Sequence, residues 1–265
     1  MTMGRLWQAN ERVSIIVLVL AGSLLIWELA VHALNIPQFL LPAPTVVIAE
    51  LWKSPGLYLH HLLATLRVTM TGFGLAVVFG VLLAVLIVHS RFMEHMLYTL
   101  LVALNSLPKV ALAPLFVMWL GTGGASKTTV AVTIAIFPIV IDTALGLRSI
   151  EPDVMNMARV MRASRWQILR RIRFPHALPA LFAGMKVAIS LALVGTIVGE
   201  FVAGGAGLGS AILSAQGTFD TPQVFASILL LGVMGTVLFY GLDFIERRLI
   251  PWHSSQRAIA ISEFN

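Results

Sequence analysis

Long apolar runs alternate with short polar joints along the whole chain. The runs lie at about residues 14–34, 72–88, 96–120, 130–147, 180–202 and 224–242. A helix rises about 1.5 Å per residue, so about 20 apolar residues cross a hydrocarbon core of about 30 Å. The pattern therefore predicts an all-α membrane protein with six transmembrane helices.

Composition agrees with this pattern, because 58% of the residues are hydrophobic, 11% are charged and the mean hydropathy is +0.91. A soluble domain has about 45–50% apolar and about 25% charged residues. No joint carries a soluble composition, so we assign residues 1–258 to a single transmembrane domain and residues 259–265 to a tail. The chain has no cysteine, which excludes thiolate metal sites and cysteine nucleophiles.

The segment between the first two runs is polar and rich in proline. Residues 45–52 read as a short amphipathic helix that residues 53–56 stop. His60 and His61 follow, but adjacent side chains on a helix point about 100° apart and no third metal ligand is evident. A hydrated pair at the membrane interface is the better interpretation.

The third run is interrupted by Pro108 and Pro114, with Lys109 between them. Proline frees backbone carbonyls that cannot face lipid, so these kinks belong inside a bundle. An ammonium group at that depth needs a partner or a water-filled path.

Two interpretations of Lys109 stay open. It lies beside an anion path, or it snorkels or pairs with Asp142 or Glu200. Asn105 and Ser106 are one turn away and can supply hydrogen bonds in either case.

Glu200 ends the fifth run just before the glycine-rich segment 204–209. Glycine spacing of this kind is weak evidence for a nucleotide loop, because apolar helices flank it and no strand precedes it. A tight turn or a re-entrant segment is the better interpretation.

The basic residues divide unevenly between the two faces of a protein with six spans. One face has thirteen arginines and the other has three basic residues, Lys53, Arg67 and Lys127, while Lys109 and Lys186 lie within spans. The positive-inside rule then places both termini and residues 148–173 in the cytoplasm. In a membrane protein such charge reports topology better than a nucleic-acid partner.

A basic polar island occupies residues 150–175 between the fourth and fifth runs. Pro152 and Asp153 favour a helix start, and this helix is expected to reach about Met161. Ser164 and Gln167 have the spacing of a capping box, which begins a second helix that Pro175 is expected to end.

Exposed apolar side chains in this helical hairpin lie among arginines, so the hairpin does not span lipid. Such a surface suits docking on another protein. The alternative is a basic loop that only fixes topology or touches anionic headgroups.

The island resembles the cytoplasmic loop of permease subunits of bacterial ABC importers, whose pattern is Glu-Ala-Ala, three residues, Gly, nine residues, Ile, one residue, Leu and Pro. Ala158, Ile172 and Pro175 match this pattern. The positions that depart from it are Asn156, Met157, Arg162 and Phe174. Residues 162–190 resemble the family closely, and the segments LPAPTVV, SLPKVALAPLFVMWLGTG and GEFVAGGAGLGSAI resemble its nitrate, sulfonate, taurine and bicarbonate branch.

The resemblance implies a type I importer permease fold in a bacterial inner membrane. Two permease subunits, the second expected to be identical, would form the pathway, with two ATPase subunits and a periplasmic or lipid-anchored solute-binding protein as partners. The chain has no phosphate loop of its own, so ATP and Mg²⁺ would be bound by the ATPase, and this subunit would be no enzyme. The expected coupling residues are Asn156, Met157, Ala158, Arg159, Met161, Arg162, Ala163, Ser164, Ile172 and Pro175.

Arg162 stands where the importer pattern has glycine. Arginine adopts a positive φ only at a cost, so we expect this turn to be helical or extended. Arg162 would then reach an acidic group on the ATPase or Asp153.

The branch suggests a small anion as substrate, such as a sulfonate, nitrate or an organic carboxylate, with a neutral or heterocyclic solute as the alternative. The pathway candidates are Asn105, Ser106, Lys109, Thr196 and Glu200. A secondary transporter is disfavoured because no inverted repeat is evident and the acids within the spans are scattered. A membrane enzyme would need clustered catalytic or metal-ligating side chains, which the chain lacks.

Overall fold

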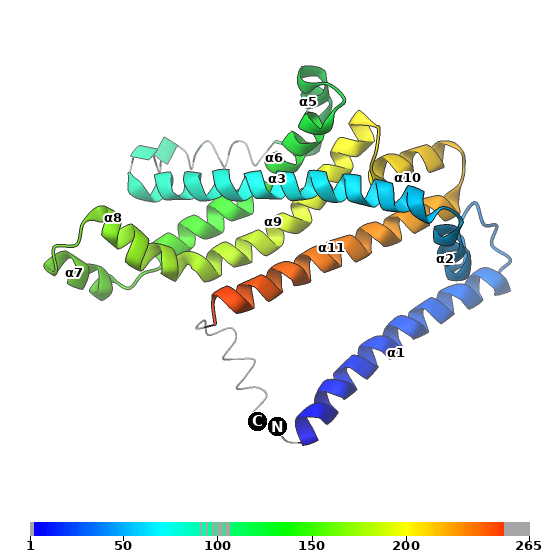
Figure 1. The fold of residues 1–265 in the computed structure, drawn as a ribbon, viewed down its shortest axis with the longest axis horizontal. Helices are drawn as coiled ribbons and strands as arrows, with labels where there is room; N and C mark the ends of the chain where they lie inside the picture. The colour runs from blue at the N-terminus through cyan, green and yellow to red at the C-terminus, as the bar shows by residue number, and fades with distance from the viewer. Residues whose placement is uncertain are drawn as a thin grey trace.

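The computed structural model describes residues 3–90, 92–93, 95–96, 99, 103 and 107–251, with side chains from residue 18. All regular elements within these residues are helical, as predicted (Figure 1). They are α1 (Met3–Ala33), α2 (Pro44–Lys53), α3 (Pro55–His89), η1 (Lys109–Leu112), α5 (Ala113–Leu120), α6 (Gly124–Arg148), α7 (Pro152–Val160), α8 (Arg165–Ile168), η2 (Leu169–Arg173), α9 (Phe174–Ala203), α10 (Leu208–Gly217) and α11 (Thr221–Leu249).

Four helical stretches in the described part of the chain are long and apolar enough to cross a membrane. They are Pro55–His89, Gly124–Arg148, Arg165–Ala203 and Thr221–Leu249, and two shorter apolar stretches lie at Leu18–Ala33 and Lys109–Leu120. All six correspond to predicted runs, and the four long stretches extend beyond their runs. The stretch that matches the second run begins at Pro55 rather than near residue 72, because proline at the first helical position starts a helix and the polar residues that follow do not stop it.

The expectation that Pro175 ends a helix is wrong. Arg165–Ala203 is one continuous helical stretch in which η2, a π-helical turn, directly precedes α9. A proline ring clashes with the carbonyl four residues earlier, which here belongs to Arg171 inside the π turn. The wider π turn gives the ring room, so the helix continues.

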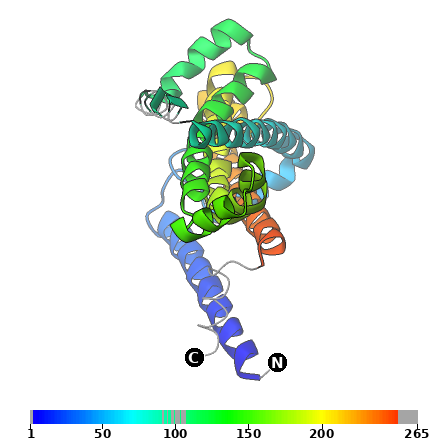
Figure 2. The same ribbon diagram turned by 90° about the vertical axis from the view of Figure 1, so that its left-hand side faces the viewer.

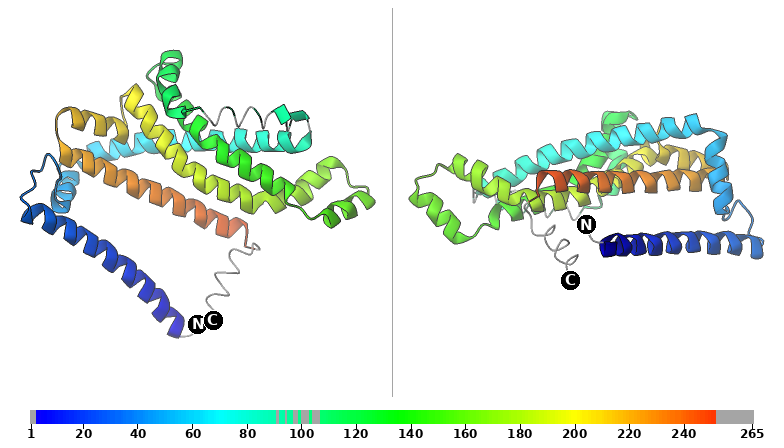
Figure 3. Two further views of the ribbon diagram at one scale, coloured as in Figure 1. Left: turned by 180° about the vertical axis from the view of Figure 1, so that it is seen from behind. Right: turned by 60° about the horizontal axis from the view of Figure 1, so that its bottom comes forward.

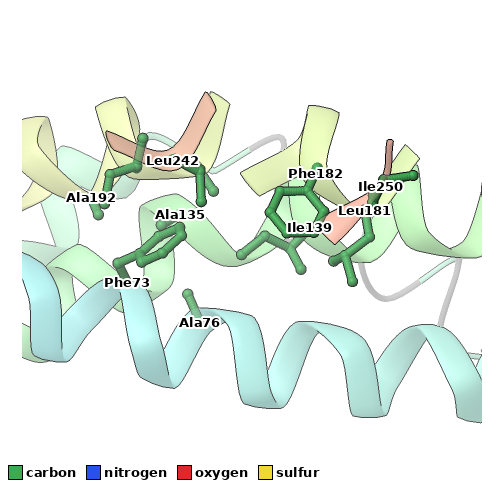
Figure 4. Close-up of a cluster of buried hydrophobic side chains, with 11 residues drawn as sticks. Phe73, Ala76, Ala135, Ile139, Leu181, Phe182, Ala192, Leu242 and Ile250 are labelled. Atoms are coloured by element: carbon green, nitrogen blue, oxygen red, sulfur yellow. The ribbon is translucent and has the colours of Figure 1, made fainter. Parts of the chain in front are cut away.

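Helices α3, α6 and α9 pack closely because small residues face one another. A Cβ atom added to Gly195 of α9 would lie 2.7 Å from the Cα atom of Ala131 in α6, and one added to Gly72 of α3 would lie 2.7 Å from the Cβ atom of the same alanine. Apolar side chains from α3, α6, α9 and α11 fill the adjoining core, among them Phe73, Ile139, Phe182 and Leu242 (Figure 4).

The bundle has two distinct ends. At the hairpin end, α3 and α6 finish near α7 and α8, and α11 ends toward the same side, beside α9. At the opposite end lie α2, α10 and residues 204–207 (Figures 1 and 3). The predicted basic island therefore lies at one end of the spans, and the glycine-rich segment lies at the other.

Helix α1 lies apart from the main bundle (Figure 2). It contacts α2, where the Glu28 carboxylate accepts hydrogen bonds from the amide (3.1 Å) and the hydroxyl (2.8 Å) of Thr45. It also contacts α11, where the ring of Phe225 lies 5.8 Å from that of Trp27. Because Thr45 is in the first turn of α2, the carboxylate also satisfies a backbone donor that has no partner within the helix.

Candidate functional site

The hairpin of α7 and α8 turns at Arg162, whose φ is +54°. The Ala163 amide donates to the Ala158 carbonyl at 3.0 Å, and the Arg162 amide donates to the Arg159 carbonyl at 2.9 Å. These two bonds form a Schellman motif, in which the residue after the helix is left-handed and is usually glycine.

The prediction that this turn is helical or extended is therefore wrong. The Schellman bonds impose the positive φ regardless of the side chain, and arginine accepts the strain. The same geometry supplies a physical reason for glycine at this position of the importer pattern. No ion pair joins Arg162 to Asp153 within the residues that the structure describes.

The start of α8 is the predicted capping box. The Ser164 hydroxyl accepts from the Gln167 amide at 3.2 Å, and the Ser164 amide donates to the Gln167 side-chain oxygen at 2.8 Å. The hairpin thus has a defined cap on each side of its turn.

The hairpin exposes its large apolar side chains. Val160 is 83% exposed, and Met157, Met161 and Trp166 are also exposed. Ala158 is the buried member of α7, at 5% exposure. Arg159 also stays within the hairpin, where it donates to the Asn156 side-chain oxygen at 3.4 Å.

We expect Arg162→Gly to stabilise the hairpin turn by about 1 kcal/mol, because glycine adopts a positive φ without a Cβ clash. Hydrogen exchange of the amides of Arg162 and Ala163 should slow about fivefold. Arg162→Ala is the control, since it removes the same charge but keeps the strain. Equal slowing in both variants would contradict this explanation.

Of the predicted pathway residues that the structure describes, Lys109 makes one set of contacts, and Thr196 and Glu200 share another. Asn105 and Ser106 lie outside the described residues. Lys109 begins η1, and its ammonium group lies 3.9 Å from the centre of the Phe137 ring on α6, a cation–π contact. Its role beside an anion path stays a prediction.

Thr196 and Glu200 belong to a polar seam between α9 and α3, formed with Thr65 and Thr69; all four residues have no exposed surface. The Thr69 and Thr196 hydroxyls are 3.1 Å apart, and the Thr65 hydroxyl donates to Glu200 Oε1 at 2.8 Å. The seam is buried between helices of one subunit.

Glu200 also holds the glycine-rich segment. Its Oε2 accepts from the Gly209 amide at 2.7 Å, and its backbone carbonyl accepts from the Ser210 hydroxyl at 3.2 Å. Gly207 has a φ of +144°, and a Cβ atom there would collide with the Glu200 carboxylate. The segment is therefore a tight turn that packs around the buried Glu200 carboxylate, and the interpretation as a turn is confirmed.

Two further side chains hold this turn, and sequence reasoning missed both. His61 Nδ1 accepts from the Gly207 amide at 3.0 Å, and Lys127 Nζ donates to the Ala206 carbonyl at 3.1 Å. His61 is thus a partner of the turn and not simply a hydrated interfacial group. Lys127, which is 6% exposed, also places its charge near Glu200.

A signal for the seam was present in the sequence. Thr65 and Thr69 are four residues apart, as are Thr196 and Glu200, so each pair lies on one helix face. No pattern in the sequence shows that the two faces pack against each other. Among the described residues, no group of metal-ligating side chains forms around the two histidines.

Comparison with known proteins gives one family. Residues 76–251 match the family described as binding-protein-dependent transport system inner membrane component. The riboflavin transport system permease protein of Chloroflexus aurantiacus is 40% identical over 88% of this chain and 87% of its own length.

Two further relatives differ in their named solutes. The formylaminopyrimidine transport permease protein of Halalkalibacterium halodurans is 35% identical over 88% of this chain and 93% of its own. An aliphatic sulfonates transport permease protein of Bacillus subtilis is 28% identical over 87% and 84%.

A solved structure shares the fold. It is the inward-facing MetNI methionine ABC transporter, with a TM-score of 0.59 and 20% identity over 78% of this chain and 98% of that one. The helical bundle with its hairpin end is thus the fold of an ABC importer permease. By the family match and these relatives, the chain belongs to the binding-protein-dependent transport system inner membrane component family and is a permease subunit of an ABC importer.

Proposed function

We propose that two copies of this chain form the translocation pathway of an ATP-driven importer, and that the hairpin of α7 and α8 docks each copy on an ATPase subunit. The observation that carries the proposal is the hairpin surface, where Met157, Val160 and Met161 are exposed beside arginines at one end of the spans. A soluble protein partner would cover such a surface. A solute-binding protein would deliver the substrate at the opposite end of the bundle.

The mechanism is mechanical and involves no bond chemistry in this subunit. ATP binding closes the two ATPase subunits, and each docked hairpin moves with its ATPase. The continuous helix from Arg165 to Ala203 carries that motion through the membrane, because α8, η2 and α9 are one helical stretch. The bundle then rocks between inward-open and outward-open forms.

The charge distribution supports an orientation with the hairpin in the cytoplasm. The seven arginines between Arg148 and Arg173 and the pair Arg247 and Arg248 lie at or near the hairpin end. Lys53 and Lys127 lie toward the opposite end. By the positive-inside rule, the termini are cytoplasmic in this proposal.

Docking is tested by placing acids on the exposed hairpin. We expect the double variant Val160→Asp, Met161→Asp to lose at least nine tenths of the copurified ATPase, because two buried, unpaired carboxylates oppose association. Phe219→Asp is the matched control, since Phe219 is 80% exposed at the opposite end of the bundle. Full ATPase recovery with the double variant would refute docking through this surface.

For the substrate, the relatives of higher identity favour a heterocyclic solute over a small anion. Riboflavin and formylaminopyrimidine are the solutes named for relatives 40% and 35% identical, whereas the sulfonate relative is 28% identical. The cation–π contact of Lys109 with Phe137 places a charge of the broken third span beside an aromatic ring of α6, which suits either class.

Substrate class is tested on the importer reconstituted with its solute-binding protein. We expect uptake of riboflavin or a pyrimidine, and no uptake of taurine or nitrate at the same concentration. Uptake of taurine or nitrate alone would return the assignment to the small-anion class, and Lys109→Ala should then raise the KM for that anion.

A further inference from the structure

A cavity of about 440 Å³ lies at the hairpin end, between the last turn of α3 and the hairpin. Val85, Val88 and His89 line it from α3, while α7, α8 and η2 close the other side. The cavity is separate from the polar seam, but Arg159 and Ala163, two of the expected coupling residues, line it.

Three arginines face this cavity. Arg159, Arg165 and Arg173 line it, and no carboxylate is among its described lining residues. The Nε atom of Arg173 is buried and has no hydrogen-bond partner among the described residues, and the like charges of Arg148 and Arg159 act on this guanidinium. A buried donor without a partner and crowded like charges both favour an anion.

The remaining lining is apolar. Val85 and Val88 lie on the α3 side, and Ile168 and Leu169 lie on the hairpin side. An inorganic phosphate or a carboxylate of another protein would satisfy the arginines but would leave this apolar wall uncovered. A phospholipid matches both parts, because its phosphate meets guanidinium groups while its glycerol and first acyl carbons meet valine and leucine.

The position of the cavity agrees with this ligand. His89 ends a helix long enough to cross the bilayer, so the cavity lies at the level where headgroups lie. We propose that the cavity lined by Arg159, Arg165, Arg173 and Val88 is a binding site for the phosphate headgroup of an anionic phospholipid, which fastens the hairpin to the end of α3. The binding site does not require the proposed function, although any effect on ATPase coupling rests on it.

The test uses the full chain in nanodiscs of phosphatidylcholine, titrated with phosphatidylglycerol, with bound lipid counted by native mass spectrometry. We expect Arg165→Gln, whose side chain is exposed at the mouth of the cavity, to weaken phosphatidylglycerol binding about tenfold. Arg165→Gln with Arg173→Gln should abolish binding. Arg248→Gln removes one charge from the same end of the bundle outside the cavity and should leave the affinity unchanged.

Three results would overturn the proposal. The first is equal phosphatidylglycerol binding in the wild type and the double variant. The second is displacement of the lipid by millimolar inorganic phosphate, which would make the cavity a free-anion site. The third is a double variant that binds phosphatidylglycerol as the wild type does but no longer copurifies with the ATPase, which would assign these arginines to the ATPase. Retained lipid binding without any ATPase partner would instead reject the proposed function alone.

Discussion

Glu200→Ala is expected to lower the free energy of unfolding by about 3–5 kcal/mol and the apparent Tm by about 10 °C. The carboxylate has no exposed surface, and its loss leaves the Gly209 amide without its acceptor and Lys127 without the charge beside it. The turn at residues 204–207 should loosen as a result, and uptake should fall with it. Thermal unfolding followed by tryptophan fluorescence, together with hydrogen exchange of the Gly209 amide, measures both effects.

The variant also separates a structural role from a pathway role for Glu200. Glu200→Gln keeps one oxygen acceptor, so we expect about half the loss of stability, while Glu151→Ala removes an exposed acid and should be neutral. A stable Glu200→Ala protein that has lost uptake would place the carboxylate in contact with the substrate. That outcome would remove the turn-holding role.

Lys186→Met is expected to destabilise the bundle by about 3–5 kcal/mol, because it leaves two carboxylates of α11 without their ion-pair partner. The Lys186 ammonium group pairs with both Asp243 and Glu246, whose side chains are 18% and 14% exposed. Arg247, 2.8 Å from Asp243, compensates one of them only in part. The loss should appear as a lower Tm and as easier proteolysis of α11.

A rescue experiment distinguishes the ion pairs from simple packing. Lys186→Met combined with Asp243→Asn and Glu246→Gln removes the stranded charges and should recover most of the stability. Arg248→Met, which changes an exposed basic residue of α11, serves as the control. A triple variant as unstable as the single one would show that the aliphatic stem of Lys186, and not its charge, holds α9 to α11.

Some local signals in this sequence predicted the structure correctly, and others did not. Pro152 and the Ser164–Gln167 pair predicted the hairpin because caps are formed by residues a few positions apart. The prediction that Pro175 ends a helix was wrong because the effect of this proline depends on the π turn before it, and residue preferences do not predict that turn. Arg162 misled because the Schellman bonds outweighed the intrinsic preference of arginine.

The contacts around Glu200 show the same limit at longer range. Thr65 and Glu200 are 135 residues apart, and His61 and Gly207 are 146 apart. Each residue looks ordinary within its own apolar run, since a membrane helix tolerates single hydroxyl, imidazole or carboxyl groups for many reasons. Only the packing of α3 against α9 shows that they form one unit.

The close approach at Ala131 limits how the proposed transport cycle can proceed. Gly72 and Gly195 both meet this one alanine at distances that leave no room for a methyl group, so α3, α6 and α9 cannot slide past one another. The three helices must turn together as a rigid body, with bending confined to joints outside this block, such as residues 121–123. Two spin labels within this block should keep a fixed separation through the ATP cycle. The distance between a label on α3 and its copy in the second subunit should change by the full amplitude of the motion.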